Sequence, residues 1–405
     1  MSNPNMPQNP FEAIPDPEEE ARQIKDIADR TVKLLDKRYR SKNNPILRGV
    51  HPKSHGCVRA VFQVNADIGK EYQVGLFAKP GKRYDAWIRY SNAEARPPRP
   101  DVRTKDQKEG GGLEHGSRGM AVKVLNVGGR ILLDDHGAKN QDFLMITEPS
   151  FAFANVADYQ RLTQVIDENN DEAGPFFVPP QNATPEDKQR ITKTLELIGG
   201  IRAKAVANPL EVPYFGAAPF LFGPDRVMKF SAQPSAGVKA QTVLENPPPS
   251  ADYLREALLK TMSEDEDICF DFMVQVRGKE NALNKEDPLN IENASSPEWD
   301  KTKFPFVKVE KTPIPAPQKD IDSESGVKHC ENLVFTPWHS LAEHQPLGSI
   351  NRLRKAVYIA SETHRGAKAV PPPDATKQPN GRRIVDGSSS HDPGVFRSRR
   401  PRRSI

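Results

Sequence analysis

Short apolar runs separated by turn residues fill the first third of this 405-residue chain. Tight turns rich in Gly, Pro, Asp and Asn join them, as in Lys79-Pro-Gly-Lys82. Many short strands at such intervals are typical of antiparallel barrels and sandwiches, so the spacing predicts one of these two architectures. The predicted strands of this region span residues 58–64, 72–76, 84–90, 120–125, 130–133 and 143–146.

Helical and strand-like patterns alternate along the rest of the chain. We expect a helix over residues 17–40, because acidic side chains near its start and basic ones near its end match the helix dipole. Further helices are expected at 156–166, 185–205, 253–262 and within 333–365. Strands return at 219–222, 227–230 and 268–276, with 304–309 as an edge strand. This distribution predicts an α+β domain over residues 18–365, between a flexible arm (1–17) and a basic, disordered tail (366–405).

The net charge of +4 comes mainly from the tail, where nine Lys and Arg residues face three Asp residues. The preceding body is therefore close to neutral or slightly acidic, which fits a small uncharged substrate better than nucleic acid. A nucleic-acid or membrane-surface role for the arginine-rich tail is a weaker reading than a solvated low-complexity segment. No run of about 18 apolar residues is present, so no membrane span is expected.

The cysteines are three, far apart in sequence and odd in number: Cys57, Cys269 and Cys330. They show no metal-binding spacing, and a disulfide framework is not expected from them. Reduced thiols, together with an N-terminus that lacks the charged and apolar regions of a signal peptide, predict a cytoplasmic protein.

An arginine precedes a tyrosine by four residues in Arg354-Lys-Ala-Val-Tyr358. At helical spacing the guanidinium lies beside the phenol, and a nearby cation favours the phenolate. A tyrosinate is a known axial ligand of haem iron. Taken alone, such a pair is usually part of an ordinary amphipathic helix face.

Five motifs in this order resemble the haem catalase family, over residues 44–365. The family reads Arg-Val-Val-His-Ala-Lys-Gly at its distal histidine and Arg-x-x-x-Tyr at its proximal ligand. The motifs here are Arg48-Gly-Val-His51-Pro-Lys-Ser-His-Gly56, Trp87-Ile-Arg-Tyr-Ser91, Ser117-Arg-Gly-Met-Ala-Val-Lys123, Lys139-Asn-Gln-Asp-Phe-Leu-Met-Ile146 and Arg354-Lys-Ala-Val-Tyr358.

The resemblance implies an antiparallel eight-stranded β-barrel with surrounding helices and a bound haem, of the b type. His51 would shuttle the peroxide proton, Ser91 would fix the histidine, and Asn140 would donate a hydrogen bond to peroxide. Tyr358 would bind the iron, kept ionised by Arg354. The other cofactor-binding residues would be Arg48, Arg89 and Arg365 at the propionates, Val50 on the distal face, and Phe143, Phe151 or Phe153 as apolar walls.

Hydrogen peroxide or an organic or lipid hydroperoxide is the expected substrate, and the oligomeric state stays open, with a homo-oligomer among the options. The chain is shorter than ordinary catalases and resembles the small catalase-related haem proteins. One alternative is a fatty-acid hydroperoxide isomerase of the allene oxide synthase type, although that branch has a threonine where Val50 precedes His51. The other is a haem-binding protein without turnover.

Overall fold

The computed structural model describes residues 11–40, 45–93, 100–105, 112–133, 139–236, 242–246, 248–278, 290–296 and 298–367. These residues belong to one compact unit, Met1–Pro371. The predicted tail lies almost wholly outside the described residues, and so does most of the predicted arm.

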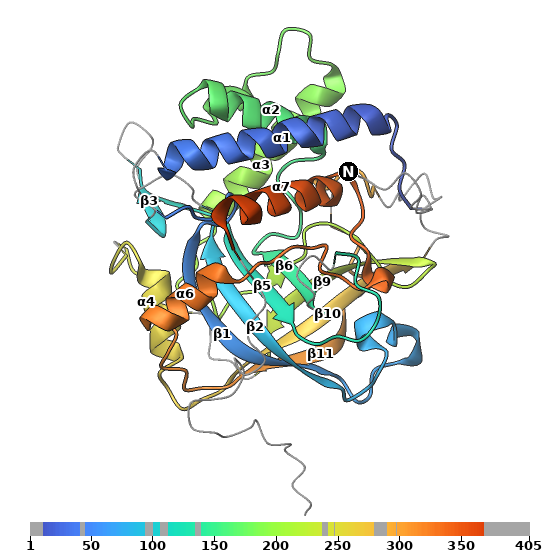
Figure 1. Cartoon of the computed structure of the whole chain (residues 1–405), viewed down its shortest axis with the longest axis vertical. Coiled ribbons are helices and arrows are strands. Elements are labelled where there is room, and N and C mark those ends of the chain that lie inside the picture. The colour runs from blue at the N-terminus through green and yellow to red at the C-terminus, as the bar shows by residue number, and fades with distance from the viewer. Residues whose placement is uncertain are drawn as a thin grey trace, which may run out of the picture. The chain divides into compact units, whose positions relative to one another are not determined.

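Eight antiparallel strands form a closed ring, because the pairing of β9 with β10 joins the two ends of the sheet (Figure 1). This confirms the predicted α+β fold with an eight-stranded barrel, and a closed sheet has no free edges to protect. In ring order the strands are β1 (Lys53–Val64), β2 (Arg83–Asn92), β5 (Arg118–Val124), β6 (Gln141–Ile146), β7 (Tyr214–Phe215), β9 (Arg226–Pro234), β10 (Ile268–Gly278) and β11 (Val307–Ile314).

Aromatic side chains fill the barrel. Alternate residues of a strand point to the same face, so Phe270 and Phe272 both face inward from β10. The Phe143 ring centroid lies 4.7 Å from that of Phe272 and 5.8 Å from that of Phe62. Because burying one such ring stabilises a fold by roughly 1.5–3 kcal/mol, this cluster contributes much of the barrel's stability.

Helices α1 (Pro17–Arg38), α2 (Val156–Glu168) and α7 (Ser349–Arg365) pack against one another on one side of the barrel (Figure 1). Asp16 caps α1 by accepting a hydrogen bond from the Glu19 backbone nitrogen, which satisfies one free donor of the first turn. Helices α4 (Tyr253–Thr261) and α6 (Glu324–Asn332) contact β1. The remaining elements are α3 (Pro185–Ala203), the ribbon of β3 (Val102–Thr104) and β4 (Leu113–His115), β8 (Phe220–Leu221), and the 3-10 turns Lys70–Tyr72, Gly75–Phe77, Gly174–Phe177 and Ala342–His344.

Four local predictions differ from the structure. Residues 72–76 are not a strand, because Gly75 has a φ of 53° and starts a 3-10 turn there. Residues 130–133 contribute only a single bridge, from Ile131 to Leu341. The expected edge strand 304–309 is β11, which has neighbours on both sides and is therefore interior. Helix α6 lies in a region with no predicted helix.

The prediction that no cysteine forms a disulfide was wrong. Cys57 on β1 and Cys330 on α6 are bonded across 273 residues, with their Cα atoms 5.4 Å apart. Sequence spacing gave no sign of this pair, because the contact arises only when α6 packs on β1. The expectation of reduced thiols therefore no longer supports a cytoplasmic location. None of the described helices has the length and apolarity needed to cross a bilayer.

The double variant Cys57→Ser/Cys330→Ser should lower the free energy of unfolding by about 2–4 kcal/mol, because the cross-link limits the unfolded chain. Denaturant titration of both proteins measures this difference. Cys269→Ser is the matched control, since Cys269 is not disulfide-bonded. Equal stability of the wild type and the double variant under oxidising conditions would contradict the role of the bond.

Candidate functional site

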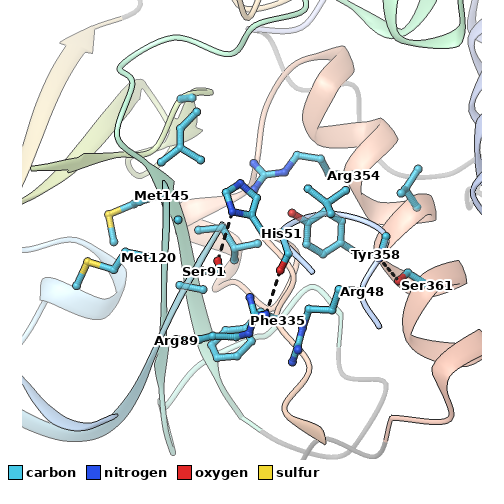
Figure 2. A pocket seen from close by; sticks show the side chains of 18 of the residues that line it. Arg48, His51, Arg89, Ser91, Met120, Met145, Phe335, Arg354, Tyr358 and Ser361 are labelled. Carbon is cyan, nitrogen blue, oxygen red and sulfur yellow. Dashed lines mark hydrogen bonds between the residues drawn. The ribbon is translucent and has the colours of Figure 1, made fainter. Parts of the chain in front are cut away.

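One cavity lies between the barrel strands β2, β5 and β6 and helix α7 (Figure 2). The centre of a water molecule can move through about 130 Å³ of it, and the space between its atoms, part of which is open to solvent, totals about 1160 Å³. Residues that are up to 317 positions apart in sequence meet here. The predicted site residues that line it are Arg48, Val50, His51, Arg89, Ser91, Phe151, Arg354, Tyr358 and Arg365.

His51 lies just before β1, in the left-handed region with a φ of 51°. Its Nδ1 atom is 3.3 Å from the Ser91 hydroxyl, and its carbonyl oxygen accepts a hydrogen bond from the Arg89 guanidinium at 3.0 Å. A non-glycine residue with positive φ is held there only when its surroundings fix it. These two contacts with β2 therefore orient the imidazole in the cavity.

Gly119 on β5 makes room for the imidazole. A Cβ atom at this position would lie 2.6 Å from Nδ1 of His51 and 2.9 Å from the Ser91 hydroxyl oxygen. Both separations are shorter than real Cβ contacts. Any other residue at position 119 would displace the ring, so this glycine is part of the site, although the sequence alone did not single it out.

Burial, together with the nearby Arg89 and Arg354 cations, lowers the pKa of His51 to about 3. The imidazole is therefore neutral at pH 7 and has one nitrogen able to accept a proton. An uncharged base next to an apolar cavity is suited to removing a proton from a bound ligand.

A cluster of arginines also borders the cavity, and Arg89 brings it close to His51. Arg48 and Arg89 approach the Glu331 carboxylate, at 2.7 Å and 3.9 Å respectively. Arg365 donates to the Glu331 carbonyl oxygen at 2.8 Å. Burial, together with the neighbouring Arg48 cation, lowers the pKa of Arg89 to about 9 and that of Arg365 to about 10.

Two buried donors of this cluster have no hydrogen-bond partner, namely the Nε atoms of Arg89 and Arg365. Buried polar atoms are usually paired, although the described residues hold other unpaired atoms in the core as well. Both side chains line the cavity, and guanidinium groups are positively charged, so this part of the cavity suits an anionic group.

Helix α7 supplies the residues that face His51 across the cavity. The Arg354 guanidinium lies 5.6 Å from the centre of the Tyr358 ring and donates a hydrogen bond to Asn351 at 3.0 Å. Figure 2 shows Tyr358 and Arg354 on the helix, with His51 between them and Ser91. The predicted i, i+4 pair therefore points into the same cavity as the predicted proton shuttle.

The walls of the cavity are mostly apolar, and most of these residues were missed from the sequence. The missed residues belong to strands β5 and β6, to the segment 334–335 and to the inner face of α7, and the apolar pattern of these segments was the only sign of them in the sequence. The main apolar lining residues are Val50, Ala121, Leu144, Ile146, Phe151, Val334, Phe335, Leu353 and Val357.

Asn140 is not among the described residues that line the cavity. It precedes β6, whose opposite end, Ile146, pairs with Gly119 beneath His51. Six residues of extended strand span about 20 Å, so Asn140 is too far away to contact a ligand at His51. The structure therefore gives no support to its predicted role as a peroxide donor.

Two predicted wall residues also lie outside the cavity lining. Phe143 packs inside the barrel against Phe62 and Phe272. Phe153 contacts Tyr159 and Phe176, with ring centroids 5.4 Å and 5.6 Å away. Side chains of a strand alternate between its two faces. Phe143 therefore points into the barrel, whereas its neighbours at 142 and 144 point to the outer face, where the cavity lies.

The stability of the haem-free protein should fall as the pH drops below about 6.5. His51 has a lower pKa in the folded state than the usual value of about 6.5, so the unfolded chain binds a proton that the folded protein excludes. The loss is at most roughly 1.4 kcal/mol per pH unit for this group. Denaturant titrations at pH 7.5 and 5 should show that His51→Gln loses less free energy of unfolding between these pH values than the wild type does. Ser91→Ala, which removes no titratable group, should show the same change of unfolding free energy with pH as the wild type. If His51→Gln also showed that same change, the lowered pKa of His51 would be refuted.

Comparison with known proteins finds no matching family model and no matching curated protein. Solved structures do match. A bacterial catalase superposes with a TM-score of 0.60 at 14% identity, covering 98% of this chain and 70% of its own. A fungal catalase gives a TM-score of 0.56 at 15% identity, and the match covers 90% of this chain and 70% of the fungal chain. Catalase A from Saccharomyces cerevisiae gives a TM-score of 0.58 at 16% identity, and the match covers 100% of this chain and 78% of the yeast chain. With its closed barrel and flanking helices, the chain has the catalase fold.

Proposed function

We propose that this protein is a haem-dependent oxidoreductase that decomposes peroxides. The observation that carries the proposal is the meeting, in one apolar cavity, of a neutral histidine on one side and an arginine–tyrosine pair on the other. His51 and Tyr358 come from opposite ends of the chain, and both line this cavity. The catalase fold adds support, because the named structural neighbours are catalases.

The residues of the cavity fit a haem. Four guanidinium groups line it, those of Arg48, Arg89, Arg354 and Arg365, whereas Glu362 is the one carboxylate among the described lining residues and Glu331 contacts Arg48 beside it. Positive side chains therefore outnumber carboxylates here, which suits the two anionic propionates of a haem. The apolar walls suit the porphyrin ring.

Tyr358 would hold the iron through its phenolate oxygen, with Arg354 favouring the charged form. Arg48, Arg89 and Arg365 would bind the propionates with charge-assisted hydrogen bonds, which are stronger than neutral ones. When bound, the haem supplies the redox-active iron that splits a peroxide O–O bond.

His51 would move the proton. If Nδ1–H donates to the Ser91 hydroxyl, the Nε2 lone pair is free to accept a proton from the peroxide. The same nitrogen then returns the proton to the departing oxygen, which leaves as water or an alcohol. The lowered pKa of His51 keeps the imidazole neutral at pH 7, so one ring nitrogen carries a lone pair that can face the peroxide.

Tyr358→Phe should abolish or markedly change the absorption bands that appear when haem is added to the wild-type apoprotein. The physical reason is that phenylalanine has no oxygen to bind the iron. Tyr159→Phe is the matched control, because Tyr159 also lines the cavity but lies on α2, and its bands should stay normal. A wild-type protein that remains colourless, or a Tyr358→Phe spectrum identical to the wild type, would refute the proposed ligand.

Gly119→Ala should fold and take up haem but lose peroxide turnover by about 100-fold, because the methyl group would push the imidazole out of position. Oxygen release and peroxidase assays measure the loss. Gly116→Ala is the control, since a Cβ there meets only Arg118 at 3.5 Å, an ordinary contact. Full activity of Gly119→Ala would show that the position of His51 does not matter.

The product of a lipid hydroperoxide separates the two alternatives from this proposal. An isomerase of the allene oxide synthase type would yield an epoxide without needing an electron donor. A haem-loaded protein that is inert to every peroxide would instead be a binding protein. Oxygen release from hydrogen peroxide, or donor-dependent formation of an alcohol, supports the proposal.

A further inference from the structure

Helix α6 ends beside the arginines that line the cavity. The last carbonyl groups of a helix have no partner within the helix, and they carry the negative end of its dipole. Arg48 donates hydrogen bonds to the carbonyl oxygens of Cys330 at 3.1 Å and of Leu333 at 2.6 Å. Arg365 donates to the carbonyl oxygen of Glu331 at 2.8 Å. The end of α6 therefore orients two of the guanidinium groups of the cavity.

The Glu331 side chain adds an ionic contact to the same group. Its carboxylate lies 2.7 Å from the Arg48 guanidinium and 3.9 Å from that of Arg89. Burial alone would raise the pKa of this carboxyl, but the Arg48, Arg89 and Arg365 cations outweigh burial and hold the pKa below its usual value. Glu331 is therefore charged at pH 7, and its charge offsets the repulsion among the three cations.

The disulfide fixes the same turn of α6 to the barrel. Cys330, whose carbonyl oxygen accepts a hydrogen bond from Arg48, is bonded through its sulfur to Cys57 on β1. Arg48 itself lies shortly before β1. The cross-link therefore joins the part of the chain that carries the donor to the part that carries its acceptors.

Noncovalent contacts also hold α6 on the barrel. The rings of Trp87 and His329 lie 4.6 Å apart, and Arg59 pairs with Asp320, ahead of the helix, at 2.7 Å. A ring pair and a partly exposed ion pair permit small displacements that a covalent bond prevents. Hydrogen bonds weaken steeply when donor and acceptor are misaligned. Without the disulfide, α6 therefore stays in place but orients its arginines less strictly.

We propose that the Cys57–Cys330 disulfide positions the arginine cluster, which consists of Arg48, Arg89 and Arg365, so that haem binds more tightly when this bond is formed. The inference rests on the proposed haem-dependent function and adds how that site is regulated, namely by the thiol redox state. Groups that are already held in their bound orientation lose less entropy on binding. The two carboxylates of a haem therefore meet guanidinium groups that need no further ordering.

The redox step exchanges one disulfide for another. A dithiol reductant supplies two electrons and two protons, and the bond between the two sulfur atoms of the protein breaks. Cys57 and Cys330 become thiols while the reductant becomes a disulfide. Ligand binding and redox state are linked, so haem must favour the disulfide by the same factor by which the disulfide favours haem.

Absorbance titrations of the apoprotein with haem and with haem dimethyl ester test the proposal, because the ester keeps the ring and the iron but has no carboxylate charge. Cys57→Ser/Cys330→Ser should bind haem about tenfold more weakly than the wild type, since charge-assisted hydrogen bonds lose their alignment. Its affinity for the ester should be unchanged. Cys269→Ser, the matched control, removes the cysteine outside the disulfide and should bind both compounds as the wild type does.

The redox equilibrium of the wild type gives a second measurement, which also decides the matter if the double variant does not fold. The protein is equilibrated with mixtures of reduced and oxidised dithiothreitol, and its free thiols are alkylated and counted by mass spectrometry. Saturating haem should raise the equilibrium constant for disulfide formation about tenfold, whereas the ester should leave it unchanged.

A folded double variant with the wild-type affinity for haem would overturn the inference alone. An equal loss of affinity for haem and for the ester would do the same, because the bond would then support only the fold. Equal effects of the two compounds on the disulfide equilibrium would also overturn it. A wild type that takes up no haem would overturn the proposed function and this inference with it.

Discussion

An unbalanced group of buried charges is the constraint on which the site depends. Like charges that gather away from water raise the free energy of the folded state unless an opposite charge binds them. Here Glu331 pairs with Arg48, while the Nε atoms of Arg89 and Arg365 have no partner. Such a cavity suits an anionic ligand, and the haem that we propose would bring two carboxylates on an apolar ring.

The barrel register turns this binding cavity into a candidate reaction site. Pairing of β2 with β5 and of β5 with β6 places Ser91, Gly119 and Ile146 in one row, and the His51 imidazole lies over Gly119. A shift of one residue would point each of these side chains into the barrel core. The same register therefore fixes the orientation of the base and the apolar surface beside it.

Periodicity predicted most helices, and the family resemblance predicted the eight-stranded barrel, which periodicity alone left open as a barrel or a sandwich. Most of the predicted site residues line one cavity, although their roles stay predictions. It did not predict the pairing of Cys57 with Cys330, since that contact depends on how α6 packs on β1. Asn140 was assigned from a motif resemblance, whereas the strand register places Ile146 at His51. Gly119 was missed because the reason for it, a close approach of the imidazole, exists only in three dimensions.

Binding of haem and of haem dimethyl ester to the apoprotein tests the central claim most directly, because the ester keeps the apolar ring and the iron but removes both propionate charges. Titration followed by absorbance should show at least about tenfold tighter binding of haem, since each charge-assisted pair at a buried arginine contributes appreciably. Equal affinity for the two compounds would contradict the account, because the arginine cluster would then serve no anionic ligand.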